Sequence, residues 1–253
     1  MEQSSFSPLI SANDLVLRYP GADFPALDRL SIEVPQGQVF GLLGPNGAGK
    51  TTAISVMCTL LRPDQGSLMV CGCDLLRQPK KVRSQIGLVP QDIALYPSLS
   101  ARENLHYFGR LHGMSGVTLR QRAEECLTLV GLQESADRPV LTYSGGMKRR
   151  ANLAVGIVHH PQLLFLDEPT VGIDAQSRNM ILENLAQLKE SGMTMVYTTH
   201  YMEEAQQLCA RIAIVDRGRV IAQGAPDSLV AEQTDCENLE ELFLHLTGRQ
   251  LRD

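Results

Sequence analysis

The segment VFGLLGPNGAGKTT, residues 39–52, decides how this chain folds. It opens on a short apolar run, Val39 to Leu43, which predicts a buried strand, and it leads into apolar side chains at helical spacing. Between them, Gly44 to Thr51 matches the P-loop pattern G-x-x-x-x-G-K-[ST], in the strand–loop–helix context that this pattern requires. Its glycines let backbone N–H groups turn inward around phosphates, and the N-terminus of the following helix adds a favourable field.

A second apolar run, Leu163 to Leu166, is followed directly by Asp167 and Glu168. A continuous apolar run is typical of a strand buried on both faces, and ligands collect at the carboxyl ends of such strands. We therefore expect Asp167 to hold Mg²⁺ and Glu168 to polarise the attacking water. In the P-loop, Lys50 is expected to reach the β- and γ-phosphates and Thr51 to offer its hydroxyl to Mg²⁺.

Elsewhere, strand-like and helical patterns alternate along the chain. This alternation predicts an α/β domain with a mainly parallel core sheet. Strands are expected at residues 10–19, 30–34, 39–43, 163–166 and 193–198, and a hairpin at 212–215 and 220–222. Helices are expected after the P-loop, over much of 98–133 with a break near 113–116, after residue 146, and at 175–190 and 202–208.

Composition narrows the possible functions. Of 253 residues, 43% are hydrophobic and 20% charged, which is typical of a globular protein. A formal charge of −5 gives the chain no overall basic character, so nucleic acid is not expected as a partner. No stretch approaches the roughly 18 apolar residues that cross a bilayer, and Met1 to Ile10 do not resemble a secretory signal. Six scattered cysteines predict free thiols in a reducing cytoplasm.

Further features resemble the ATPases of ABC transporters, over about residues 10–224. Ser144-Gly-Gly146 before a basic helix resembles the signature motif, and the segment from Pro169 to Asp174 resembles the D-loop. Three single residues fall where that family has its Q-loop, its switch histidine and the aromatic that stacks on adenine, namely Gln91, His200 and Tyr19. The signature departs from the family pattern at Tyr143 and Met147, and the D-loop has Ile173 in place of leucine.

The resemblance implies a P-loop NTPase fold with an N-terminal antiparallel β-subdomain and an inserted helical lobe. It also implies functional roles. Catalysis is expected from Glu168, His200 and Gln91, and Mg²⁺ binding from Thr51, Gln91 and Asp167. ATP contacts are expected from Tyr19, Gly44, Asn46, Gly47, Ala48, Gly49, Lys50, Thr51, Thr52, Ser144, Gly145, Gly146 and Asp174.

The chain more closely resembles the ATPases of bacterial type-2 ABC exporters, a group that includes the daunorubicin-resistance ATPase. Four segments carry it: Glu103 to Gly109, Glu168 to Asp174, Thr199 to Ala205 and Leu239 to Thr247. It implies an ATPase domain over residues 8–240, a helical lobe at about 92–160 and a short tail at 241–253. It also implies a head-to-tail dimer with a second copy around ATP, and a separate transmembrane permease contacted by residues 92–99, including Tyr96 and Leu99, and by Tyr107. The expected location is the cytoplasmic face of the plasma membrane.

Other classes of ATPase and nucleotide-binding protein fit the sequence less well. A soluble ABC ATPase of DNA repair or translation would carry a coiled-coil insertion or two ATPase halves, and neither is present. It remains the alternative function. A GTPase or small-molecule kinase would not account for Ser144-Gly-Gly146 or His200, and no Asn-Lys-x-Asp segment reads guanine. A catalytically inactive ABC fold is opposed by Glu168.

Overall fold

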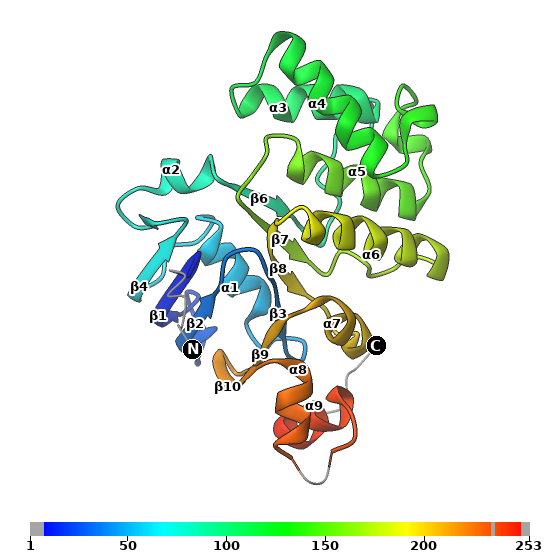
Figure 1. The fold of residues 1–253 in the computed structure, drawn as a ribbon. Helices are drawn as coiled ribbons and strands as arrows, with labels where there is room; N and C mark the ends of the chain where they lie inside the picture. Colours follow the sequence, from blue (N-terminus) through cyan, green and yellow to red (C-terminus); the bar gives the residue numbers. More distant parts are fainter. Residues whose placement is uncertain (1–7, 234–235, 249–253) are drawn as a thin grey trace, which may run out of the picture.

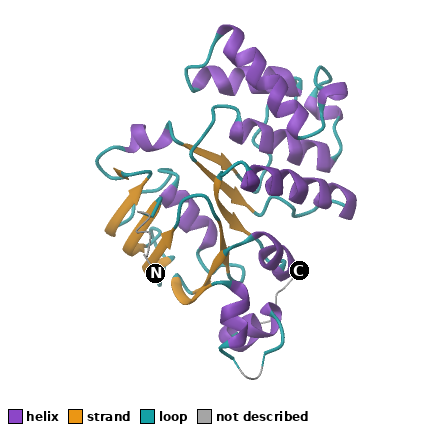
Figure 2. Ribbon diagram, viewed as in Figure 1, coloured by secondary structure: helices purple, strands orange, loops and turns teal. Residues whose placement is uncertain are grey.

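The computed structural model describes residues 8–233 and 236–248, which form two β-sheets flanked by helices (Figures 1 and 2). The larger sheet has six strands in the order β10-β9-β3-β8-β7-β6. Five of them are parallel, and only the edge strand β10 is antiparallel to its neighbour β9. The strands are β3 (Val39–Leu43), β6 (Ile86–Val89), β7 (Leu163–Asp167), β8 (Thr194–Thr198), β9 (Arg211–Asp216) and β10 (Arg219–Gly224).

The smaller sheet is antiparallel, with the strand order β2-β1-β4-β5. Along β2 the buried residues Leu30, Ile32 and Val34 alternate with exposed ones, so one face of this sheet packs in the core and the other meets solvent. The strands are β1 (Ile10–Leu17), β2 (Leu27–Val34), β4 (Gln65–Val70) and β5 (Cys73–Asp74).

The helices divide into those around the core sheet and those of a lobe. Around the sheets are α1 (Lys50–Met57), α2 (Pro79–Arg83), α6 (Ala175–Glu190), α7 (Met202–Leu208), α8 (Pro226–Ala231) and α9 (Leu239–Thr247). The lobe holds α3 (Ala101–Leu111), α4 (Gly116–Leu129) and α5 (Gly145–Ile157), with 3-10 turns at Gln133–Ser135 and Val140–Thr142. Helix α3 begins with a complete capping box between Ser100 and Glu103.

The core sheet is buried on both faces. Along β7, Leu163 and Phe165 pack with α1 and the antiparallel sheet, whereas Leu164 and Leu166 pack with the lobe and the C-terminal helices. Helix α1 therefore lies between the two sheets (Figure 1). Burying a large apolar side chain contributes about 1.5–3 kcal/mol, which explains why these strands are continuous apolar runs.

The helical lobe leaves the core sheet between two neighbouring strands. β6 and β7 are hydrogen-bonded to each other, with Val89 opposite Leu166, yet the chain between them builds α3, α4 and α5. The predicted tail from residue 241 begins inside α9, which buries Leu242 and Phe243 in the core, and residues 249–253 lie outside the described part. The division into domains stays a prediction.

The predicted fold class is confirmed, including the mainly parallel core sheet, the antiparallel sheet and the helical lobe. The sequence patterns gave no expectation for β4, β5, β6, α2, α8 and α9. These elements are short or weakly patterned: β6 has four residues and ends at Val89, directly before Pro90, and β4 buries only Leu68 and Val70. All six cysteines are free, and four of them, Cys58, Cys73, Cys126 and Cys209, are buried. Within residues 8–233 and 236–248, no helix has the length and apolar character needed to span a bilayer.

Gly87 offers a test of how the lobe is joined to the sheet. It lies in β6, and a Cβ there would overlap the carbonyl oxygen of Gly156 in α5 and lie 2.9 Å from Leu164 Cδ1. We expect Gly87→Ala to lower the free energy of unfolding by about 1–3 kcal/mol, as overpacking does. In Gly145→Ala the Cβ would meet Ile173 at an ordinary 3.7 Å, so this helical control should not be destabilised. Urea unfolding measures both, and equal stabilities would contradict the close packing of β6 on α5.

Candidate functional site

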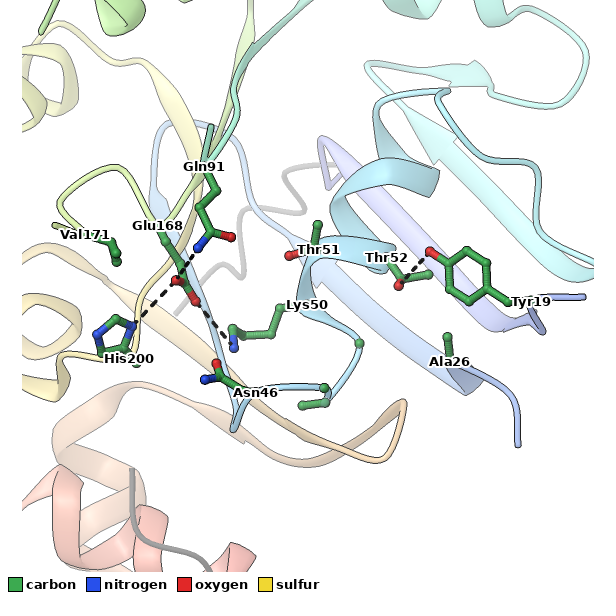
Figure 3. Close-up of a pocket in the computed structure, with 13 residues that line it drawn as sticks. Tyr19, Ala26, Asn46, Lys50, Thr51, Thr52, Gln91, Glu168, Val171 and His200 are labelled. Atoms are coloured by element: carbon green, nitrogen blue, oxygen red, sulfur yellow. Dashed lines mark hydrogen bonds and ion pairs between the residues drawn. The ribbon is translucent and has the colours of Figure 1, made fainter. Parts of the chain in front are cut away.

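A cleft of about 620 Å³ opens at the carboxyl edge of the core sheet (Figure 3). Most of the residues predicted to act in binding and catalysis meet there. The loop after β3 enters it from one side, and the segments after β6, β7 and β8 from the other. Its lining residues are Tyr19, Ala26, Asn46, Gly47, Ala48, Gly49, Lys50, Thr51, Thr52, Gln91, Glu168, Val171 and His200.

The P-loop turns sharply into α1. Gly49 is the residue before the helix and has φ 107, a backbone conformation that side chains disfavour, and a Cβ there would lie 2.5 Å from the Ala26 carbonyl. Lys50 follows, and its Nζ donates to the carbonyl oxygens of Gly44 at 2.8 Å and Pro45 at 3.3 Å. The lysine therefore folds back over its own loop and directs its ammonium to the cleft.

Lys50 carries a positive charge in a nearly buried position. Burial lowers the pKa of its ammonium, and the charges of Glu168 and Asp167 offset part of that shift. Its Nζ lies 3.7 Å from Glu168 Oε1, so the cleft contains a lysine–carboxylate pair that is shielded from bulk water. A cation held in this way suits a strongly anionic ligand such as a polyphosphate.

Asp167 and Thr198 end two neighbouring strands and touch each other. They are opposite in the register of β7 and β8, and Thr198 Oγ1 donates to Asp167 Oδ1 at 2.7 Å. Asp167 is 4% exposed. The hydrogen bond fixes one carboxylate oxygen of a buried side chain at the carboxyl end of β7, where its charge acts on Lys50.

Glu168 has a strained backbone. Its φ of 47 lies in the left-handed region, which costs a non-glycine residue about 1–3 kcal/mol. The Glu168 N–H donates to Thr198 Oγ1 at 2.9 Å, and this bond to the adjacent strand stabilises the turn. As a result, the consecutive carboxylates have different surroundings: Asp167 is buried against Thr198, while Glu168 enters the cleft (Figure 3).

Three side chains from three segments converge on the Glu168 carboxylate (Figure 3). Gln91 Nε2 donates to Oε2 at 3.4 Å, and His200 Nδ1 lies 3.6 Å from the same oxygen, while Lys50 approaches Oε1. A carboxylate with donors on both oxygens, facing an open cleft, can orient a water molecule and accept its proton.

Two further contacts position the ends of the cleft. Arg149 of α5 donates to the backbone carbonyl of Gln91 and, at 3.0 Å, to that of Val171, so it joins the segments after β6 and β7. At the other end, the Tyr19 hydroxyl lies 3.2 Å from Thr52 Oγ1, which holds the ring beside the start of α1. Tyr19 is 43% exposed, leaving a ring face available for stacking.

The side chains predicted to hold Mg²⁺ form an oxygen-donor set. Thr51 and Gln91 line the cleft, and the buried Asp167 directly precedes Glu168, which also lines it. Within the described residues, no cluster of three or more His, Cys, Asp or Glu is arranged to hold a metal. Mg²⁺ is usually bound by one or two carboxylates together with the phosphates of a substrate. One carboxylate accompanied by neutral side-chain oxygens fits this mode of binding.

Five residues predicted to contact the nucleotide are not among those that line this cleft. One is Gly44, whose carbonyl oxygen accepts from Lys50 Nζ, and the other four begin helices α5 and α6. Ser144 caps α5 by accepting from the Met147 N–H at 3.2 Å, with Gly145 and Gly146 in the first turn. Asp174 caps α6 in the same way, accepting from the Ser177 N–H at 2.9 Å. Conversely, Ala26, Val171, Thr198 and Arg149 were not predicted, because their roles depend on which segments the fold brings together.

Known proteins that are similar to this chain in sequence or structure indicate one family. The ABC transporter family model matches residues 27–171. The linearmycin resistance ATP-binding protein of Bacillus subtilis is 50% identical over 85% of this chain and 71% of its own length. The Nod factor export ATP-binding protein I of Ralstonia nicotianae is 42% identical over 92% of this chain and 72% of its own.

The daunorubicin/doxorubicin resistance ATP-binding protein of Streptomyces peucetius is 46% identical over 87% of this chain and 66% of its own length. Among solved structures, a dimeric ATP-binding cassette in a post-hydrolysis state with ADP and phosphate superposes with a TM-score of 0.78. It is 26% identical and covers 85% of this chain and 98% of its own. The predicted resemblance to the ATPases of bacterial type-2 ABC exporters, the group that includes the daunorubicin-resistance ATPase, is confirmed.

The position of Glu168 predicts a separation of binding from turnover. Glu168→Gln keeps the shape of the side chain but cannot accept a proton, so we expect kcat for ATP hydrolysis to fall by about 10²-fold or more. ATP affinity should be retained, because Lys50 and the P-loop are intact. Phosphate release and ATP titration measure the two quantities, with Glu190→Gln, an exposed site at the end of α6, as control. Hydrolysis at the wild-type rate would remove Glu168 from catalysis.

Proposed function

Because this chain belongs to the ABC transporter family, as an ATP-binding subunit with ATPase activity, we propose that it drives export by closing with a second copy around ATP. A separate membrane subunit would receive the motion at the cytoplasmic face of the plasma membrane. One observation carries the proposal. The chain has two surfaces suited to phosphate, the cleft and the N-terminus of α5, and they are not parts of one pocket.

The N-terminus of α5 is built as an anion site that faces outward. Ser144 and Gly145 are exposed, and the helix N-terminus provides free N–H groups and a favourable dipole. Gly146 packs directly against Ser177 of α6, so the starts of α5 and α6 form one unit with Asp174 beside them. A second chain in head-to-tail orientation would bring this unit to the γ-phosphate of ATP in the first chain's cleft. The dimeric state of the superposed cassette supports this arrangement.

In the proposed reaction, the residues of the cleft divide the work. Lys50 would bind the β- and γ-phosphates, and Glu168 would orient the attacking water, with Gln91 and His200 fixing the carboxylate. Thr51, Asp167 and Gln91 would hold Mg²⁺, which, when bound, neutralises phosphate charge. Because ATP contacts both subunits, it would close the dimer, and loss of the γ-phosphate would release those contacts.

A second cleft next to the first supports docking of a membrane subunit. It has a volume of about 510 Å³ between the end of α1, β6 and the lobe, and among its lining residues are Leu60, Pro90, Ala94 and Phe108. Pro90 precedes Gln91, so one short segment lines both clefts. If this segment moved when ATP is bound or hydrolysed, residues of the docking surface would therefore move with it.

The edge of this second cleft exposes large apolar side chains. Leu60 is 64% exposed, and Tyr96 and Tyr107, 45% and 39% exposed, are joined by a hydrogen bond between their hydroxyls. Exposed apolar clusters of this kind mark interaction sites. The name of the Nod factor export relative supports the outward direction. An ATPase without a membrane partner is the alternative function, and the docking experiment separates the two.

Dimer closure can be tested with a trapping variant. Glu168→Gln should accumulate an ATP-bound dimer, because its nucleotide is not hydrolysed. Adding Ser144→Arg places a bulky side chain at the surface that meets the second chain, so the dimer should be lost. Ser144→Ala in the same background controls for loss of the helix cap, which costs about 1 kcal/mol. Analytical ultracentrifugation with ATP and Mg²⁺ measures the dimer. If Glu168→Gln with Ser144→Arg dimerised as well as Glu168→Gln alone, the head-to-tail arrangement would be wrong.

Docking can be tested at Leu60. Leu60→Glu places a charge in the apolar second cleft, so the fraction of protein that sediments with washed native membranes should fall several-fold, while ATP hydrolysis by the purified chain should not. Val117→Glu, at a position 69% exposed in α4, is the matched control. Equal membrane association of the two variants and the wild type would favour the alternative function.

A further inference from the structure

Glu204 is a buried carboxylate that lies outside both clefts. It belongs to the first turn of α7 and is 1% exposed. Its two oxygens accept four hydrogen bonds. Oε2 accepts from the hydroxyls of Tyr197 at 2.6 Å, Thr199 at 2.6 Å and Thr170 at 3.2 Å, and Oε1 accepts from Arg178 Nε at 2.7 Å.

Such a carboxylate needs a specific reason to be there. Burying an ionised group costs several kcal/mol unless it is paired and hydrogen-bonded. Here the partners are complete, with one guanidinium and three hydroxyl donors. Burial, together with the charge of Glu204, raises the pKa of Tyr197 well above its ordinary value, so this hydroxyl keeps its proton and remains a donor.

The four donors come from the segments that surround the nucleotide cleft. Thr170 is two residues after Glu168, and Arg178 lies near the start of α6, one turn after Asp174. Tyr197 lies near the end of β8, and Thr199 follows this strand directly and precedes His200. One carboxylate therefore joins the turn that carries Glu168, the helix that begins at the proposed dimer surface, and the loop of the histidine.

Two routes lead from Glu204 to His200. In the first, the Thr199 hydroxyl donates to Glu204 and accepts from the Tyr201 N–H at 3.0 Å. Thr199 and Tyr201 precede and follow His200, so this hydroxyl brackets the His200 backbone by fixing the residue on each side of it. In the second, the Arg178 guanidinium lies 4.3 Å from the centre of the Tyr201 ring, and that ring lies 4.2 Å from the His200 ring. Backbone and side chain of His200 are thus both supported.

We propose that Glu204 is a positioning residue that holds His200 against Glu168 and links this pair to the start of α6. The inference rests on the catalytic role proposed above for His200. Glu204 acts through its hydrogen bonds and touches no substrate. It ties the histidine to the part of the chain that a second subunit would contact, so the geometry at Glu168 becomes sensitive to that contact.

The test is Glu204→Gln, which removes the charge with little change of shape. Because a catalytic group displaced by about an ångström can cost up to about 10²-fold in rate, we expect kcat for ATP hydrolysis to fall by about 10- to 100-fold. Binding of a fluorescent ATP analogue should be unchanged, since no member of the cluster belongs to the P-loop. The matched control is Glu203→Gln, in the same turn of α7 but exposed, which should hydrolyse ATP like the wild type.

A double-mutant cycle separates positioning from general damage to the fold. If Glu204 acts through His200, then Glu204→Gln should cause no further loss in the His200→Ala background. Single-turnover hydrolysis with enzyme in excess keeps these slow rates measurable. Losses that multiply, or a Glu204→Gln rate equal to that of Glu203→Gln, would overturn the inference. Wild-type hydrolysis by His200→Ala would instead overturn the role of the histidine itself.

A second variant covers the case in which Glu204→Gln does not fold. Thr199→Val keeps the volume of the side chain but removes the hydroxyl that connects Glu204 to the Tyr201 N–H. It should also lower kcat, leave analogue binding unchanged and add nothing to His200→Ala. Full activity of Thr199→Val would overturn the first route and with it the bracketing of His200.

Discussion

The backbone hydrogen bonds that place β8 between β3 and β7 are the constraint on which the nucleotide cleft depends. In the register of these three parallel strands, Leu42 of β3 is paired with Thr198 of β8, and Thr198 is paired with Asp167 of β7. The carboxyl ends of these strands lie at one edge of the sheet. The P-loop, the two carboxylates and His200, which follow or end these strands, therefore lie close together in space. β6 adds Gln91 from the far side of β7. A shift of one residue in this register would move Thr198 from Asp167 and remove the bond that stabilises the turn at Glu168.

Two carboxylates near this edge are held in contrasting ways. Glu168 faces partners at 3.4–3.7 Å on a strained turn, an arrangement that leaves the side chain free to reorganise around a ligand. Glu204 accepts bonds as short as 2.6 Å from fixed donors in the interior. The second carboxylate is therefore fixed by short hydrogen bonds, whereas the first is held by longer contacts. Catalytic sites commonly combine a reactive group with such a supporting set of hydrogen bonds.

Much of the fold and most of the cleft were predictable from sequence, because their signals are local. The P-loop is a contiguous pattern, and Asp167 and Glu168 end a run whose apolar character already indicates burial. Thr198, Arg149 and Glu204 carry no such signal. Thr198 matters because β8 pairs with β7, and Arg149 because α5 returns from the lobe to the segments after β6 and β7. Glu204 and exposed Glu203 are adjacent and identical in type, and only the packing of α7 distinguishes them. Strand β6 was not predicted, because four residues are too few to show a strand pattern.

The sheet order also has a consequence for how the chain acquires its shape during synthesis. β3 ends at Leu43, but its two partners in the sheet, β8 and β9, begin only at Thr194 and Arg211. An emerging chain therefore carries an apolar strand with both edges unpaired until most of the protein has been made. Such distant pairings slow folding and expose surfaces that aggregate. The same delay means that a chain interrupted before β8 has a P-loop but neither the neighbouring strand nor His200, so partial products of translation lack the assembled cleft.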